Sequence, residues 1–465
     1  MFLGIGLVAV LCSCGATWLA RDLARAHSLV DVPTRAKPGI HTQLTPLLGG
    51  AAVYATFVAL IFGAYFFLDI FDQSTILPKH LFGLAMGGAL LMIGGYLDDR
   101  FRLPPKKQLI APLAAVVVVM VSGIGVVFIT NPFGGLLRLD SLVITLVQTP
   151  SIHWKITVWA DLFTLVWLMG MMYTTKLLDG LDGLATGVTL LATLVLFAIS
   201  LMAEVPQYDT ALLATIFAGV LFGFLLWNFY PAKIFLGEGG SLFLGYILAL
   251  LAIIAGAKVT ATLMVMALPI IDVARVVIVR KFIRHTRVSQ GDFGHLHHAF
   301  LRRGFSHMQT VLLFYAVTFL LGIAALALQF ATVRAPHADL PSGKVRIADR
   351  VELAVEIADN QKTRRQGLSG RAALTPDAGM LFVFEKPDAY TFWMQDMHFP
   401  LDVIWLRGGR VVGLQADVLP PRTQDSRPQT FSPPEPVDSV LEVSAGFIAH
   451  HGVRIGDTVA YRASP

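Results

Sequence analysis

The chain has 465 residues, of which 55% are hydrophobic and only 14% are charged, and its mean hydropathy is +0.66. Soluble globular proteins carry roughly 25% charged residues, so most of this chain must lie in lipid. The net charge of +5 does not indicate nucleic-acid binding, because the basic residues cluster in particular loops. With Cys12 and Cys14 as its two cysteines, the chain cannot form a disulfide framework.

Ten apolar segments follow one another through the first 330 residues, each long enough to cross a bilayer as a helix. We predict membrane spans at residues 2–20, 47–69, 81–97, 108–129, 157–175, 184–203, 211–228, 242–256, 259–279 and 309–330. From about Ala335 the chain becomes polar and mixed in charge, which indicates a separate domain. The expected fold is a polytopic α-helical membrane protein of about ten transmembrane helices, followed by a small β-rich (α+β) soluble domain.

The basic residues of the loops between these spans are distributed unevenly. Alternate loops contain sixteen Lys and Arg residues in one set and four in the other. The richer set holds Arg21, Arg25, Arg35, Lys37, Arg100, Arg102, Lys106, Lys107, Lys176, Lys233, Arg280, Lys281, Arg284, Arg287, Arg302 and Arg303. Because cytoplasmic loops carry the excess of Lys and Arg, we expect the richer set inside and the N-terminus outside. After ten crossings the C-terminal domain would lie outside, and losing one span would reverse the location of that domain alone.

Five acidic residues lie where predicted spans meet loops of the basic-rich set, namely Asp98, Asp99, Asp179, Asp182 and Glu238. A charge at the bilayer centre costs at least ~2.5–3.5 kcal/mol, so such residues are rarely without function. The i, i+3 spacing of Asp179 and Asp182 would place both carboxylates on one face of a helix. Several carboxylates without a thiol favour a hard cation, Mg²⁺ or Mn²⁺, which neutralises charge during phosphoryl transfer. The alternative is a set of buried ion pairs that lock helices together.

Three histidines occur together in the last loop of the basic-rich set, in the sequence GHLHH. They are His295, His297 and His298, and Arg302 follows them. Imidazole and guanidinium groups suit the recognition of phosphates and base edges. Zinc is the competing interpretation, but no thiol is nearby and the basic surroundings repel a cation.

In order along the chain, these motifs resemble the polyprenyl-phosphate N-acetylhexosamine-1-phosphate transferase superfamily, glycosyltransferase family 4. DVPTRAKPGIHTQLTPLLGG is similar to the family's first loop, and GYLDDR supplies its paired aspartates. DGLDGLATG is similar to the second motif, NFYPAKIFLGEGGSLFLG to the third, and HLHH to the histidine loop. The resemblance covers the whole membrane part.

The resemblance implies that a polyprenyl phosphate attacks the β-phosphorus of a UDP-N-acetylhexosamine and releases UMP. It implies catalytic roles for Asp98, Asp99, Asp179 and Asp182, and a metal site at Glu238 and Asp179 that holds Mg²⁺ or Mn²⁺. It implies substrate-binding roles for His41, Lys106, Lys107, Lys176, Asn228, His295, His297, His298 and Arg302. The implied partners are the lipid phosphate, the UDP-sugar and the bilayer, without nucleic acid, and family members are often homodimers.

Three positions depart from the family pattern. Lys176 and Tyr173 stand where the family usually has asparagine, and Glu238 replaces an aspartate. A carboxylate one methylene longer keeps metal binding plausible, whereas Lys176 places a cation beside Asp179. The short HLHH loop resembles the GlcNAc-1-phosphate branch, so a small UDP-sugar is expected. The alternatives are phospho-MurNAc-pentapeptide translocase activity and a non-catalytic homologue.

The C-terminal part alternates apolar and polar residues in segments such as VELAVEIA, GMLFVF and LDVIWL, which predict β-strands. It resembles domain of unknown function 192 through RRQGLSGRAAL, GMLFVFEKP and FWMQDMHFPLDVIWL. We therefore divide the chain into a membrane domain at 1–332, a linker at 333–344 and a β-rich domain at 345–465. The resemblance implies no chemistry for this domain, and binding of a partner or glycan is its expected role.

The localisation expected from these features is the bacterial cytoplasmic membrane, with the site on the cytoplasmic face and the β-rich domain outside. Two other classes compete with a transferase. A transporter also has many spans and intramembrane charges, but its site lies near the midplane. A scaffold that presents the β-rich domain would not need the carboxylates.

Overall fold

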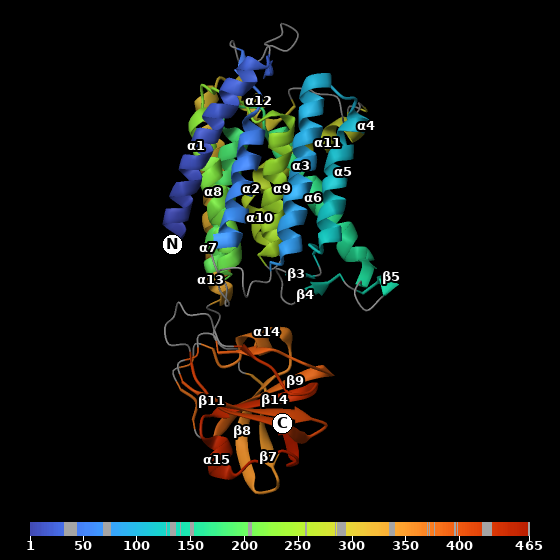
Figure 1. Ribbon diagram of the computed structural model, residues 1–465, viewed down its shortest axis with the longest axis vertical. Coiled ribbons are helices and arrows are strands. Elements are labelled where there is room, and N and C mark those ends of the chain that lie inside the picture. Colours follow the sequence, from blue (N-terminus) through green and yellow to red (C-terminus); the bar gives the residue numbers. More distant parts are fainter. Residues whose placement is uncertain are drawn as a thin grey trace. The chain divides into compact units, whose positions relative to one another are not determined.

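The computed structural model describes residues 1–463 apart from several short segments. The segments outside the described residues are 32–43, 68–75, 127, 131–135, 140, 149–152, 203–206, 256–257, 284, 286–293, 334–339, 370, 372, 376, 395–396, 398 and 421–429. The chain forms two compact units, Met1–Val333 and Arg334–Pro465 (Figure 1), and each is described by itself.

The first unit is a bundle of helices with short hairpins between some of them (Figure 1). Its helices are α1 (Phe2–Ala26), α2 (Gly49–Phe67), α3 (Pro78–Phe101), α4 (Pro105–Gln108), α5 (Ile110–Ser122), α6 (Val158–Leu178), α7 (Leu184–Leu201), α8 (Tyr208–Asn228), α9 (Gly237–Ile254), α10 (Val259–Val265), α11 (Ala267–Ile278), the π-helical turn η2 (Val279–Ile283), α12 (Leu296–Arg302) and α13 (His307–Val333). Its antiparallel strand pairs are β1 (Val30–Asp31) with β2 (Thr45–Pro46), β3 (Phe128–Thr130) with β4 (Leu136–Arg138), and β5 (Val143–Gln148) with β6 (His153–Thr157).

Within the described residues, eight helical stretches are long and apolar enough to cross a membrane, or nine if the bent pair of α10 and α11 counts as one span. That pair bends by 76°. The 21-residue α6, which contains Asp161 and Lys176, is not among these stretches. The expectation of a helical membrane protein with a β-rich domain is confirmed, and the count of ten is approximate.

Helix α9 lies at the centre of the bundle, since 83% of its apolar window is buried inside the protein. Glycines let neighbouring helices approach it closely, as is common where packing rather than hydrophobicity drives helix association in lipid. A Cβ atom at Gly95 of α3 would lie 2.0 Å from the backbone nitrogen of Gly239, and one at Gly50 of α2 would lie 2.3 Å from the Cα of Gly240. This packing brings the beginning of α9 against the end of α3.

The second unit is built on a seven-stranded sheet in the order β12-β11-β14-β9-β8-β7-β15. Neighbouring strands are antiparallel except for β8 and β9, which are parallel. Its elements are β7 (Ser342–Ile347), β8 (Val351–Ala358), α14 (Gln361–Gln366), β9 (Ala378–Asp388), β10 (Phe392–Trp393), β11 (Leu401–Arg407), β12 (Arg410–Val418), β13 (Thr430–Phe431), β14 (Val437–Ser444), α15 (Phe447–His451) and β15 (Val459–Ala463). Strands β10 and β13 form a separate pair.

Alternation along the strands gives this sheet two separate apolar clusters. One contains Leu441 and Val443 of β14, and the other contains Val440 together with Met380 and Trp405. Because residues two apart share a face, Glu442 lies on the same face of β14 as Val440. A central strand therefore carries an acidic residue toward an apolar cluster.

Candidate active site

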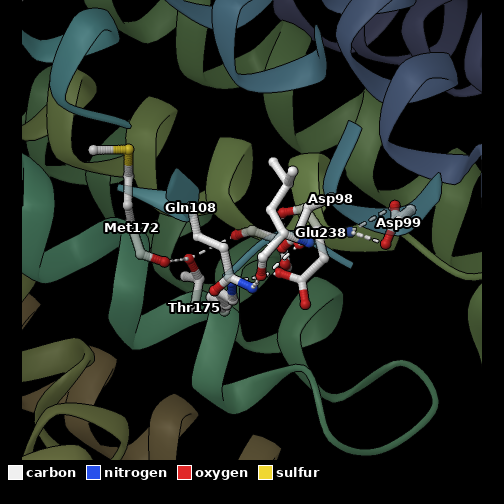
Figure 2. A network of polar contacts seen from close by, with 9 residues as sticks. Asp98, Asp99, Gln108, Met172, Thr175 and Glu238 are labelled. Carbon is white, nitrogen blue, oxygen red and sulfur yellow. Dashed lines mark hydrogen bonds and ion pairs between the residues drawn. The ribbon is translucent and has the colours of Figure 1, made fainter. Parts of the chain in front are cut away.

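Asp99 and Glu238 meet where the end of α3 contacts the beginning of α9. The backbone N–H of Glu238 donates to Asp99 Oδ2 at 3.1 Å. Gly237, which directly precedes Glu238, has a φ of +72°. A Cβ atom at Gly237 would lie 2.7 Å from Asp99 Oδ2. The Asp99 carboxylate thus accepts from the N-terminus of α9, where the helix dipole favours negative charge. Figure 2 shows both acidic side chains in one polar network.

Asp98 has a different environment from its neighbour Asp99. Its Oδ1 atom accepts hydrogen bonds from the Leu103 N–H at 2.9 Å and from the Gln108 amide at 3.2 Å. Arg102, which lies between Asp98 and Leu103 in the sequence, has a left-handed φ of +50°. The Asp98 side chain is therefore buried and holds the turn that connects α3 to α4, with Gln108 packed against it (Figure 2).

Lys176, one of the departures from the family pattern, forms an ion pair with Glu238. Its Nζ atom lies 2.6 Å from Glu238 Oε2, and both side chains are partly buried. The same ammonium lies 5.8 Å from the ring centroid of Tyr173. At the two positions where the family usually has asparagine, Lys176 thus pairs with the Glu238 carboxylate and lies near the ring of Tyr173.

Asp179 and Asp182 lie in the turn between α6 and α7, so the expectation of one helical face is wrong. Gly183 ends this turn with a φ of +75°. Asp182 is 3% exposed and accepts from the Ala232 N–H at 2.9 Å, which ties the turn to the segment between α8 and α9. Burial, followed by the charges of Glu238, Asp182 and Asp99, raises the pKa of Asp179 to about 8.

The histidine loop is fixed by an acidic residue of α11. Asp272 pairs with His295 Nδ1 at 3.0 Å and with Arg275 at 2.8 Å, and it accepts from the Leu296 N–H at 3.0 Å. His295 is therefore anchored by its ring nitrogen at the N-terminus of α12. Asp272 thus has a structural role, because its ion pairs join α11 to the histidine loop.

His297 is 1% exposed, and neither of its ring nitrogens has a hydrogen-bond partner among the described residues. It lies over Gly180, where an added Cβ would be 2.4 Å from His297 Nε2. Burial, followed by the neighbouring histidines, lowers the pKa of His297 to about 3, so the ring is neutral. A neutral imidazole with unused nitrogens beside Asp179 is a candidate contact for a ligand.

The other predicted substrate-binding residues that the structure describes are exposed or have partners within the protein. Lys106 and Lys107 are exposed on α4, and Arg302 is exposed on α12. The ring of His298 lies tilted by 51° against that of His297, with ring centroids 4.2 Å apart. Asn228 is buried between the Thr186 hydroxyl and the Ile234 carbonyl. His41 lies outside the described residues.

A cavity of about 140 Å³ opens beside Asp99. It is bounded by Ser28 after α1, by Tyr96 and Arg100 of α3, and by the beginning of α9. Neither Tyr96 nor Arg100 was predicted from the sequence as a site residue. The sequence feature that could have indicated them is their place in the GYLDDR motif, which also contains Asp99.

The site offers hard oxygen donors to a divalent cation. Asp99, Asp182 and Glu238 all act electrostatically on Asp179, and Lys176 offsets the charge of Glu238. In the part of the chain that the structure describes, no three Asp, Glu, His or Cys side chains are grouped as a ready metal site. The charge and the donor type fit Mg²⁺. An ion at Glu238 would have to displace the Lys176 ammonium.

Comparison with known proteins assigns both units. The family model "Glycosyl transferase family 4" matches residues 81–256, and domain of unknown function 192, described as "Uncharacterized ACR", matches residues 344–461. A probable undecaprenyl-phosphate N-acetylglucosaminyl 1-phosphate transferase of Bacillus subtilis is 27% identical, over 70% of this chain and 85% of its own length.

Two further relatives differ in how much of the chain they cover. The decaprenyl-phosphate N-acetylglucosaminephosphotransferase of Mycobacterium tuberculosis is 30% identical, over 67% of this chain and 78% of its own length. A phospho-N-acetylmuramoyl-pentapeptide-transferase of Lactiplantibacillus plantarum is 31% identical, but over only 39% of this chain and 54% of its own length. The chain therefore belongs to glycosyl transferase family 4, together with the polyprenyl-phosphate N-acetylglucosaminephosphotransferases, and it ends in a domain of unknown function 192.

Proposed function

We propose that the protein transfers N-acetylglucosamine 1-phosphate from UDP-N-acetylglucosamine to a polyprenyl phosphate. An oxygen of the lipid phosphate forms a bond to the β-phosphorus, the bond from that phosphorus to the bridging oxygen breaks, and UMP leaves. The relatives named above that match across most of the chain carry this activity in their names. The observation that carries the proposal is the meeting of Asp99, Glu238 and Lys176 from three separate helices.

Asp99 is the residue that we expect to hold or accept the proton of the lipid phosphate. One side of its carboxylate is fixed by the N-terminus of α9, and the residue lines the cavity of about 140 Å³. Arg100 lines the same cavity and supplies a cation for an anionic headgroup. Asp98 keeps α4 in place and acts as a positioning residue, because its carboxylate is used by the turn.

The nucleotide is expected on the side of the histidine loop. His297 can donate from one ring nitrogen and accept at the other, and Gly180 leaves it room beside Asp179. His295 fixes the loop through Asp272. A Mg²⁺ or Mn²⁺ ion at Glu238 and Asp179 would neutralise charge on the diphosphate. Lys176 either balances Glu238 or pairs with a phosphate oxygen.

The location of the site follows from charge rather than from geometry. The loops that carry Asp99, Asp179, Glu238 and His297 belong to the basic-rich set, so we propose that the site faces the cytoplasm of a bacterial cell. The β-rich unit would lie outside if α6 and the bent pair each cross the membrane once. Labelling of single cysteines introduced in each unit of intact cells tests both placements.

The decisive experiment is exchange of radiolabelled UMP into UDP-N-acetylglucosamine by the purified full-length protein with polyprenyl phosphate and Mg²⁺. We expect exchange by the wild type and a loss of at least about 100-fold in Asp99→Asn and Glu238→Ala, as is typical for removal of a charged catalytic group. Asp209→Asn, at the beginning of α8, is the matched control and keeps the wild-type rate.

Two outcomes separate this proposal from its rivals. Exchange with a UDP-muramoyl pentapeptide, and none with UDP-N-acetylglucosamine, would assign the translocase reaction. No exchange with any UDP-N-acetylhexosamine would favour a scaffold or transporter that has kept the fold of its relatives without their chemistry.

A further inference from the structure

The β-rich unit has a surface cavity of its own, of about 190 Å³. The cavity is bounded by α14, by β9 and by the segment around β10, and its lining includes Glu442 of β14. It is smaller than the roughly 300–1,000 Å³ of sites for drug-sized ligands, which limits its occupant to one compact unit.

Glu442 is the unusual member of this lining. Its residue is 5% exposed, and no hydrogen bond or ion pair to its carboxyl group is formed by the described part of the chain. Its strand lies between β11 and β9, where it pairs with Val403 and Met380. Burial alone raises the pKa of Glu442 to about 8. A buried carboxyl group with no partner in the described part of the chain is costly, and its place in the lining of a cavity lets a ligand supply one.

Aromatic rings form the wall of the cavity. Phe384 and Tyr390 stack with centroids 3.6 Å apart, and the Arg364 guanidinium lies 5.0 Å over Phe384. Phe392 packs edge-on against the buried Trp405, and Trp393 beside it is partly exposed. The stacked and edge-on contacts keep Phe384, Tyr390 and Phe392 in place, so this part of the wall presents rigid apolar faces.

Polar groups of α14 complete the lining. Gln361, Arg365 and Gln366 contribute donors and acceptors on this side. The arginines disfavour a cationic ligand, and the aromatic, largely apolar lining disfavours the burial of an anionic one. A neutral ligand with many hydroxyl groups and one apolar face satisfies both conditions. Pyranose sugars have this chemistry, because their C–H faces pack on aromatic rings while their hydroxyl groups bond to carboxyl and amide groups.

We propose that this cavity binds one neutral sugar unit, with the sugar ring against the aromatic wall and its hydroxyl groups on Glu442 and the side chains of α14. The site is separate from the carboxylates of the membrane unit, so the proposal does not rest on the transferase activity. It gives the domain of unknown function a ligand class and a position for that ligand.

The test is isothermal titration of the full-length protein in detergent with N-acetylglucosamine, its β-linked disaccharide and glucose. We expect at least one sugar to bind, and Glu442→Leu and Trp393→Ala each to raise Kd about tenfold or more, the effect of one lost hydrogen bond or stacking contact. Leucine suits an apolar cluster, so Glu442→Leu keeps or raises the melting temperature. Glu442→Gln, which retains hydrogen-bonding groups, binds more tightly than Glu442→Leu.

Matched controls keep the result specific to the cavity. Glu435→Gln removes an exposed acidic residue of the same unit outside the cavity and leaves Kd unchanged. Asp99→Asn also leaves Kd unchanged, because Asp99 belongs to the first unit and the cavity belongs to the second. The proposal is overturned if no sugar binds, if Glu442→Leu binds sugar like the wild type, or if only trimethylammonium or acetate binds.

Discussion

Asp98 and Asp99 are adjacent in the sequence and belong to the same motif, yet their hydrogen bonds show that they have different roles. Asp98 accepts from Leu103 and Gln108 and holds a turn, whereas Asp99 accepts from the N-terminus of α9 and lines a cavity. The pair could be predicted from the sequence as functional. Which of the two has access to a substrate depends on the direction of the helix end, and no residue pattern specifies that direction.

Lys176 yields a prediction about metal requirement. Its ammonium lies 2.6 Å from Glu238 Oε2, so a divalent cation must compete with it for that carboxylate. Replacement by the amide usual in the family, Lys176→Asn, removes the competitor. We expect the Mg²⁺ concentration for half-maximal UMP exchange to fall several-fold, as for removal of a nearby like charge.

Lys106→Asn is the control for this measurement, because Lys106 is an exposed lysine of α4. It changes the net charge equally and should leave the Mg²⁺ requirement as it is. If Lys176→Asn requires as much Mg²⁺ as the wild type, or more, then Lys176 does not occupy the metal position and pairs with substrate instead.

Glu442 makes the stability of the β-rich unit depend on pH. The carboxyl group has a pKa of about 8 when buried and 4.5 as the ordinary value, so the folded state keeps a proton that the unfolded state releases. The stability that Glu442 contributes is fully present below pH 4.5 and is lost as pH rises to about 8. The total loss in the free energy of unfolding is on the order of a few kcal/mol. Arg364, Arg365 and Tyr390 are the other titratable residues of the cavity lining.

Calorimetry of the full-length protein without added sugar, from pH 5 to 8.5, measures this dependence. The side chain of Glu442→Gln cannot lose a proton. The melting temperature of the β-rich unit in this variant, minus that in the wild type, should therefore increase as pH rises. Equal pH profiles for the two proteins would mean that Glu442 is ionised and paired in the folded state.

At the scale of elements, the sequence predicts well what depends on apolar length and alternation. VELAVEIA forms β8 over the whole segment, and GMLFVF and LDVIWL lie within β9 and β11. Apolar length cannot identify structure inside a loop or the shape of a short polar turn. The hairpins β3–β6 and the turn around Asp182 were therefore not anticipated, and the predicted span 108–129 ends as α5 at Ser122.

Close packing of α3 on α9 predicts that Gly95 cannot be enlarged. A Cβ there would lie 2.0 Å from the Gly239 nitrogen and 2.2 Å from its Cα, and neither backbone atom can move without shifting α9. Gly95→Ala should lower the stability by about 1–3 kcal/mol, the usual cost of overpacking. It should also reduce UMP exchange, because it separates Asp99 from Glu238.

The comparison variant is Gly63→Ala in α2, where nothing lies within 4 Å of the added methyl group. Melting temperature in detergent and exchange rate are measured for both. Similar values for Gly95→Ala and Gly63→Ala would show that the contact between α3 and α9 relaxes easily and does not position the site.

At the scale of the whole molecule, each candidate site lies in a single unit. Asp99, Lys176, Glu238 and His297 all belong to the first unit, and Glu442 with its cavity belongs to the second. The carboxylates and histidines of the first site carry recognisable motifs, so the sequence found most of them. Glu442 carries none, since its site arises from β14, β9 and α14, which only folding brings together.

This division predicts that the transfer reaction does not need a covalent connection between the units. A protease recognition sequence placed within residues 334–339 allows the folded protein to be cut after purification. Because the described site residues and their hydrogen-bond partners lie before Val333, we expect the cut protein to exchange UMP within about twofold of the uncut protein. Wild-type protein treated with the same protease is the control. A loss of exchange that appears only after cutting would mean that the β-rich unit acts on the membrane site, and that sugar binding at Glu442 has a route to regulate it.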